Sequence, residues 1–142
     1  MKNSKLMKER IHRVKVLFTE LGYEVYEGEA SEDSFTAVFE HENGFQGGFF
    51  IDGESKFLEI AFTFSFSTRL GSFVQKNLEE MLAICYEYGC YMNLQKFEGE
   101  ISFSVFSKIY YTGLNYYSLK DTLRDFKDCV ESLTEVCEIT KD

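Results

Sequence analysis

The C-terminal stretch from Ser118 to Cys137 constrains the fold of this chain more than any other segment. Apolar residues recur in it at alternating steps of four and three, with charged residues between them. These apolar residues are Leu119, Leu123, Phe126, Val130, Leu133 and Cys137. Because this spacing places them on one side of an α-helix, the segment predicts an amphipathic helix that begins at Ser118. Such a helix needs an apolar surface to cover, so we expect it to close a small domain.

Two earlier segments also show helical spacing. In the first, basic residues fill one side and Gly22 is placed to end the helix. Its apolar stripe consists of Met7, Ile11, Val14, Phe18 and Leu21. We expect this stripe to pack on the core, although a basic amphipathic helix can also bind a membrane surface. The second helix is predicted to begin at Ser72, with Ser72 and Gln75 forming a capping box, and to end at Gly89.

Alternating apolar and polar residues predict strands between these helices. The clearest run extends from Leu58 to Phe66, where five apolar residues alternate with Glu59, Ala61, Thr63 and Ser65. The other predicted strands are Tyr23 to Glu27, Phe35 to Phe39, Phe45 to Ile51, Met92 to Phe97 and Ile101 to Ile109. Short turns such as Glu42-Asn43-Gly44 join them, and turns of this kind favour antiparallel pairing.

The order of predicted elements is α-β-β-β(-β)-α-β-β-α. Each helix has a single apolar stripe and therefore needs only one sheet face to cover. We predict an α+β fold, a two-layer sandwich in which an antiparallel sheet carries the helices on one face. The 142 residues are enough for one self-sufficient core, so we expect a single domain spanning residues 1–142.

The charge of the chain excludes some classes of partner. Its 24 acidic residues outnumber 15 basic ones, which gives a formal net charge of −9, although residues 1–15 are basic. An acidic surface repels phosphate backbones, so we expect no nucleic-acid partner. No apolar run approaches the roughly twenty residues that span a bilayer, and the N-terminus does not suit a secretory signal because Lys15 interrupts Val14 to Phe18. We expect a cytoplasmic protein without a membrane partner.

The sequence shows no constellation of residues that would carry catalysis. His12 and His41 are the only histidines, and neither belongs to a ligand cluster or a nucleophile motif. Gly44, Gly47 and Gly48 suit a hairpin better than a phosphate loop, because no helix start or lysine follows them. Acidic pairs are expected by chance in so acidic a chain. We predict no catalytic residue, no metal site, no cofactor and no enzymatic activity, unless carboxylates with perturbed pKa gather in a cleft.

Four cysteines lie in the second half of the chain, without a C-x-x-C spacing. They are Cys85, Cys90, Cys129 and Cys137. We expect buried reduced thiols. A redox pair of Cys85 and Cys90 stays open, because the acidity of a thiol depends on its surroundings.

The sheet face that the helices leave uncovered is a candidate contact surface. Thr63, Ser65, Ser102 and Ser104 would make this face polar, but several aromatic residues lie on it or near it. The residues predicted to contact a partner or a second copy are Phe106, Tyr110, Tyr111, Tyr116 and Tyr117. A partly apolar, uncovered face is typical of a protein interface.

The order of elements resembles the type III secretion chaperone-like fold, which includes the YbjN-like proteins. The matching segments are Leu21 to Val25, Phe57 to Phe66, Leu78 to Asn93, Phe97 to Ile101 and the closing helix. The resemblance implies a non-enzymatic protein-binding domain, commonly a homodimer, that holds an extended partner segment along apolar patches. The basic first helix and the 15 phenylalanines depart from that pattern. An alternative from the phenylalanine content is a small-ligand carrier with a Phe-lined cavity.

Overall fold

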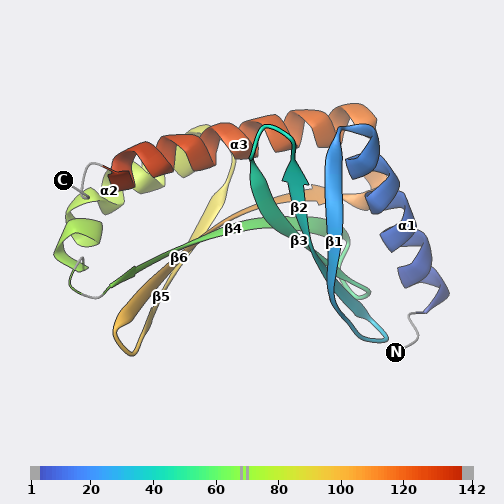
Figure 1. Cartoon of the computed structure of the whole chain (residues 1–142), viewed down its shortest axis with the longest axis horizontal. Coiled ribbons are helices and arrows are strands. Elements are labelled where there is room, and N and C mark those ends of the chain that lie inside the picture. The colour runs from blue at the N-terminus through green and yellow to red at the C-terminus, as the bar shows by residue number, and fades with distance from the viewer. Residues whose placement is uncertain (1–3, 68, 70, 139–142) are drawn as a thin grey trace. The chain divides into compact units, whose positions relative to one another are not determined.

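The computed structural model of this chain describes residues 4–67, 69 and 71–138. Figure 1 shows the helices and strands in the predicted order. The helices are α1 (Lys5–Glu20), α2 (Gly71–Glu87) and α3 (Tyr116–Glu138), with a short 3₁₀-helix, η2 (Tyr111–Gly113), before α3. The strands are β1 (Tyr23–Ala30), β2 (Ser34–His41), β3 (Gln46–Asp52), β4 (Phe57–Ser67), β5 (Tyr91–Phe97) and β6 (Glu100–Tyr110). The predicted α+β class is confirmed.

The six strands form one antiparallel sheet in the order β1-β2-β3-β4-β6-β5. Strands β1 and β5 are therefore its edge strands. The register of β2 against β3 runs from Ser34↔Asp52 to Glu40↔Gln46, and that of β5 against β6 from Tyr91↔Phe106 to Phe97↔Glu100. The tight turns that the sequence predicted join these pairs.

The chain divides into two compact units, each built from two segments. The meander unit comprises Met1–Ala61 and Lys108–Leu123, and the hairpin unit comprises Phe62–Ser107 and Arg124–Asp142. Strands β4 and β6 and helix α3 each contribute residues to both units. The expectation of a single domain over residues 1–142 stays a prediction.

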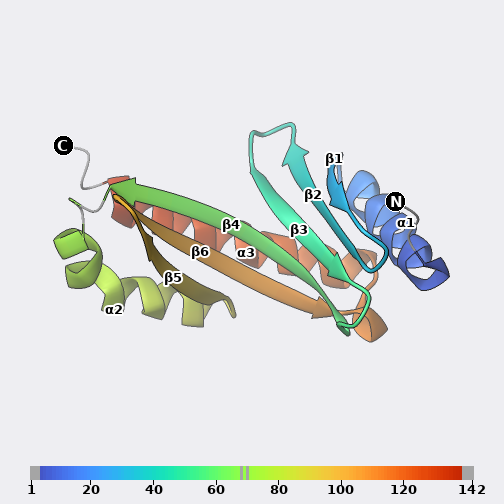
Figure 2. The ribbon, with the colours of Figure 1, turned by 90° about the horizontal axis from the view of Figure 1, so that it is seen from below.

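In the meander unit, α1 packs on one face of β1, β2 and β3 (Figure 2). Met7, Val14 and Phe18 of the predicted stripe are buried. The ring of Phe18 stacks on Phe49 with centroids 5.0 Å apart and lies 4.9 Å from Phe39. The apolar stripe of the first helix therefore belongs to the core, as we expected.

The side-chain ring of Phe39 leaves no room for a Cβ atom at Gly47 of β3. A Cβ atom at this position would lie 2.7 Å from Cζ of Phe39 and 3.1 Å from the carbonyl oxygen of Ala61. Both distances are shorter than ordinary van der Waals contact, so a larger residue would push the strands apart. Close packing in a strand, and not phosphate binding, explains this glycine.

In the hairpin unit, alternate residues of β6 from Ile101 to Ser107 are buried. The helices add Val74 and Met81 from α2 and Phe126 and Leu133 from α3 to the buried residues of this unit. All six apolar residues of the C-terminal stripe are buried. The prediction that this helix closes the core is confirmed.

Two helices begin earlier than the sequence suggested. Helix α3 starts at Tyr116, because Asn115 provides the N-cap: its Oδ1 accepts from the backbone N–H of Ser118 at 2.9 Å. Ser118 Oγ in turn accepts from the N–H of Asn115 at 2.9 Å. This reciprocal pair is a capping box, and it starts the helix two residues before the predicted Ser118, so Ser118 as first residue was wrong. Helix α2 starts at Gly71, which places Ser72 inside its first turn.

Candidate functional site

Tyr110 is the predicted contact residue that forms the best-defined surface cluster in the meander unit. Its ring meets Phe57 edge to face at a centroid distance of 5.8 Å. The Nζ atom of Lys108 lies 4.9 Å from the Phe57 centroid and 5.5 Å from that of Tyr110. Cation–π contacts of this kind hold the half-buried ring of Phe57 and the exposed ring of Tyr110 in place. The cluster can offer a partner both apolar area and a positive charge.

Tyr111 has a structural role, because it is half-buried beneath Arg10. The guanidinium carbon of Arg10 lies 4.2 Å from the ring centroid, and Nη1 donates to the carbonyl oxygens of Asp52 at 3.1 Å and Ser55 at 2.9 Å. Burial raises the pKa of Tyr111 to about 12, against the opposing effect of Arg10. Among the described residues its hydroxyl has no hydrogen-bond partner. Tyr111 therefore connects η2 to α1.

The remaining predicted contact residues are Phe106, Tyr116 and Tyr117. Tyr116 and Tyr117 pair edge to face at 5.3 Å in the first turn of α3, with Tyr117 exposed. Phe106 belongs to the hairpin unit, where it is half-buried and stands opposite Tyr91 in the register. The Tyr116–Tyr117 pair therefore forms an aromatic contact of its own in the meander unit, and Phe106 lies in the hairpin unit.

A recess of about 200 Å³ lies on the meander unit, next to Phe57. Phe50, Asp52, Ser55, Phe57 and Glu59 line it. Burial raises the pKa of Glu59. The same lining holds the carboxyl group of Asp52 and the hydroxyl group of Ser55 beside the two phenylalanines.

The two histidines differ in their surroundings. His12 is exposed on α1, while the ring of His41 meets Tyr23 edge to face at 4.9 Å. His41 Nδ1 accepts from the backbone N–H of Asn43 at 3.2 Å, inside the β2–β3 turn. Within the part of the chain that the structure describes, no group of three or more His, Cys, Asp or Glu side chains could hold a metal ion.

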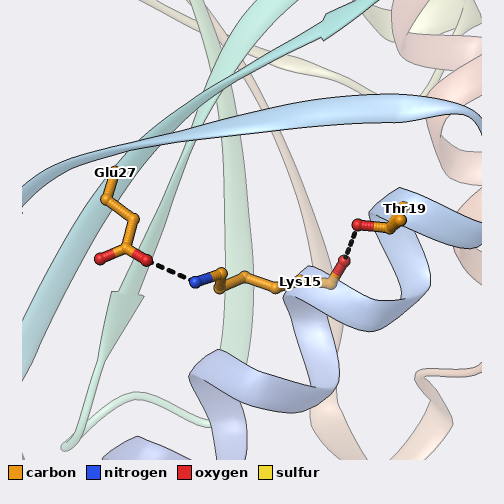
Figure 3. A network of polar contacts seen from close by, with 3 residues as sticks. All are labelled: Lys15, Thr19 and Glu27. Atoms are coloured by element: carbon orange, nitrogen blue, oxygen red, sulfur yellow. Dashed lines mark hydrogen bonds and ion pairs between the residues drawn. The ribbon is translucent and has the colours of Figure 1, made fainter.

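The two edge strands of the sheet differ in chemistry. Three glutamates, Glu24, Glu27 and Glu29, lie along β1, and its register shifts between Glu27 and Ala30. Glu27 also forms an ion pair with Lys15 of α1, whose carbonyl oxygen accepts from Thr19 Oγ1 at 2.8 Å (Figure 3). Charges and bulges of this kind discourage pairing with another chain.

Strand β5, at the other edge, is exposed and carries little charge. All its residues except Met92 are exposed, and Tyr91, Leu94 and Phe97 show 48%, 43% and 70% of their surface. Its register against β6 is regular over seven pairs, and Lys96 is its one charged residue. As an edge strand, β5 turns one row of backbone N–H and C=O groups away from β6.

Sequence reasoning predicted this strand but not its place at the edge. Its residues alternate no more clearly than those of an internal strand, so the pattern carried no signal for the edge position. The near absence of charge in Tyr91–Phe97 even pointed away from the edge, because edge strands usually carry charge.

No protein-family model matches this sequence, and no curated protein matches it significantly. The chain is similar in structure to an uncharacterized protein from Methanothermobacter thermautotrophicus, known from a crystal structure. The TM-score is 0.67 at 15% sequence identity, and the match covers 89% of this chain and 96% of the archaeal one. At this identity the likeness concerns the fold alone. No helix among the described residues has the length and apolar character needed to cross a bilayer.

Proposed function

We propose that this chain is a non-enzymatic protein-binding domain that captures an extended segment of a partner protein along β5. The observation that carries the proposal is the edge strand itself, which is regular and exposed, presents Tyr91, Leu94 and Phe97 at the surface and has Lys96 as its one charged residue. A partner strand added there would bond to the backbone of β5, which supplies affinity with little dependence on sequence.

The side chains of β5 define which partner fits. Successive residues point to opposite faces, so Leu94 is exposed on one face and Tyr91 and Phe97 on the other. A partner segment with apolar residues on both faces would cover all three. The net charge of −9 favours a segment that is neutral or basic, because an acidic one would be repelled.

The proposal includes the class that the sequence resembles. A type III secretion chaperone-like or YbjN-like protein would act in the cytoplasm, commonly as a homodimer, and would hold an extended segment of its partner. An α+β fold of three helices and a six-stranded sheet supports this assignment. The exposed aromatic residues Tyr110 and Tyr117 are available for a dimer contact.

The alternative of a small-ligand carrier has less support. The recess beside Phe57 holds about 200 Å³, which is below the roughly 300–1,000 Å³ of ordinary ligand pockets. Several of the phenylalanines expected to line a cavity instead pack against one another, as Phe18, Phe39 and Phe49 do. These observations favour protein binding.

The test begins with affinity isolation of the partner from the native host, followed by hydrogen exchange on the purified complex. We expect the backbone amides of β5 to gain protection. Leu94→Lys should weaken partner binding by about ten-fold or more, since a charge would enter the contact. Val38→Lys is the matched control, because Val38 is 47% exposed but lies on an internal strand.

Two results would contradict the proposal. One is equal binding by the wild type and Leu94→Lys. The other is protection of β1 while the amides of β5 exchange as in the unbound protein. Light scattering on the wild type separately tests the homodimer: a mass of one chain at micromolar concentration would remove that part of the proposal.

A further inference from the structure

The side chains of β5 follow a similar order from either end of the strand. An aromatic residue stands at each end, Tyr91 and Phe97, and Leu94 stands at the centre between the amides of Asn93 and Gln95. In an antiparallel pair of two β5 strands centred on Leu94, the two leucines would lie opposite each other. Each tyrosine would face a phenylalanine, and each asparagine a glutamine. The strand is therefore complementary to a second copy of itself.

The backbone of β5 suits the same register. Phe97 and Glu100 pair across a turn of two residues, so these two residues exchange hydrogen bonds between β5 and β6. Because the bonding alternates along an antiparallel pair, every second residue of β5 turns its N–H and C=O groups away from β6. These residues are Met92, Leu94 and Lys96. Leu94 is the middle one, so a two-fold axis at Leu94 lets all three bond to the opposite strand.

No like charges face each other in this register. Lys96, the one charged residue of β5, would lie opposite Met92 of the second copy. Leu94 and Phe97, with 43% and 70% of their surface exposed, would gain apolar partners. Cross-strand aromatic and aliphatic pairs stabilise a sheet, whereas like charges directly opposite destabilise it. Strand β1 lacks this property, because pairing two copies of it would gather three glutamates from each.

We propose that two copies of this chain pair through β5, antiparallel and with a two-fold axis at Leu94, and that this pairing regulates access to the edge. The sheets of the two copies then continue into each other, and neither β5 is an edge strand any longer. A partner segment has to displace the second copy before it bonds to β5. This competition rests on the function proposed above, whereas the pairing of the two copies depends on no other protein.

Analytical ultracentrifugation of the purified full-length chain tests the pairing. We expect the wild type to dimerise. Leu94→Lys and Leu94→Glu should each raise the dissociation constant of the dimer by about ten-fold or more, because like charges then meet at the axis. An equimolar mixture of these two variants should dimerise again, since opposite charges then meet there. Val38→Lys is the matched control and should dimerise like the wild type, because Val38 is 47% exposed but lies on an internal strand.

A synthetic peptide with the sequence of Tyr91–Phe97 tests the competition, because it offers β5 the same strand as a second copy does. An excess of this peptide should convert the dimer into single chains with bound peptide. The same peptide with Leu94→Lys should leave the dimer intact. Circular dichroism establishes whether each protein variant is folded. If a Leu94 variant does not fold, Phe97→Lys takes its place, since Phe97 is 70% exposed and faces Tyr91 of the second copy in the proposed register.

Three results would overturn the pairing: a wild type that stays a single chain at about 100 μM, a dimer that persists unchanged in Leu94→Lys, or a mixture of the two Leu94 variants that stays dissociated. A dimer that resists the wild-type peptide would overturn the regulation of the edge. None of these results decides whether β5 captures a partner segment, because the complex with the isolated partner tests that separately.

Discussion

The meander unit and the hairpin unit differ in the apolar residues and charges that their edge strands expose. The meander unit buries aromatic rings against one another beneath α1, and its edge strand β1 carries three glutamates and a register shift. The hairpin unit also has a buried core, but its edge strand β5 leaves Leu94 and Phe97 exposed.

The difference shows which edge of the sheet is protected. Charge and irregular register on β1 oppose the addition of another strand, while β5 has a regular register and only the single charge of Lys96, so β5 is the less protected edge. An unprotected edge is an aggregation hazard unless it is used. We therefore infer that binding, if it occurs through the sheet, occurs at β5.

The largest expected effect on stability is the difference between removing a buried ring of the meander unit and removing an exposed ring of β5. Phe18→Ala should lower the free energy of unfolding by roughly 3–5 kcal/mol, because Phe18 is fully buried among three aromatic rings. Phe97→Ala, with 70% of its side chain exposed, should change it by about 0.5 kcal/mol or less. Urea unfolding followed by circular dichroism measures both; similar losses would remove the contrast between the units.

A smaller loss of stability should follow when a glycine of the meander unit is replaced by a larger residue. Gly47→Ala should cost roughly 1–3 kcal/mol, since its Cβ would lie 2.7 Å from Cζ of Phe39. Gly113→Ala is the control, because a Cβ there meets no atom within 4 Å. Thermal unfolding compares the two variants. A Gly47→Ala protein as stable as the wild type would mean that β3 can move away from the ring.

Removal of the Lys15–Glu27 ion pair between α1 and β1 should lower stability by a still smaller amount. Lys15→Met should lower stability by up to about 1 kcal/mol at low salt, because the Lys15–Glu27 pair is partly exposed. The loss should shrink as salt is added. Lys8→Met changes an exposed lysine of the same helix and serves as the control. If both variants lose the same stability with the same salt dependence, the pair contributes nothing specific to this edge.

The smallest effect at neutral pH is expected at Tyr111. Tyr111→Phe should be neutral or slightly stabilising, since the buried hydroxyl lacks a hydrogen-bond partner among the described residues. The pKa of Tyr111 is raised to about 12 in the folded chain from an ordinary value of 10. Below pH 10 the hydroxyl is protonated in both the folded and the unfolded chain. Between pH 10 and 12 the unfolded chain loses this proton first, so the free energy of unfolding falls as the pH rises. Unfolding curves at several pH values should show the wild type losing stability relative to Tyr111→Phe over that range.

Sequence reasoning predicted most of the elements because periodicity reports burial directly. The C-terminal stripe and the alternation in β4 were strong enough to identify a helix and a strand without any tertiary information. The helix starts were less accurate. Asn115 and Ser118 both suit a cap, and only the reciprocal bonds between them show which one begins the helix.

The candidate site was harder to predict. Tyr110 and Tyr111 are adjacent in sequence, yet one is exposed on the sheet surface and the other is half-buried under Arg10. The end of α2 was easier to predict, because glycine readily adopts the left-handed conformation that Gly89 shows after the helix.

The sequence by itself determined the order of elements, the apolar side of each helix and the acidic character of the chain. These are local properties, set by side-chain spacing and composition. The strand order that makes β1 and β5 the edges, and the half-burial of Tyr111, are set by tertiary packing. The reason is physical: strand order and contacts between distant segments depend on how the apolar faces pack together, and no spacing within one segment records that choice.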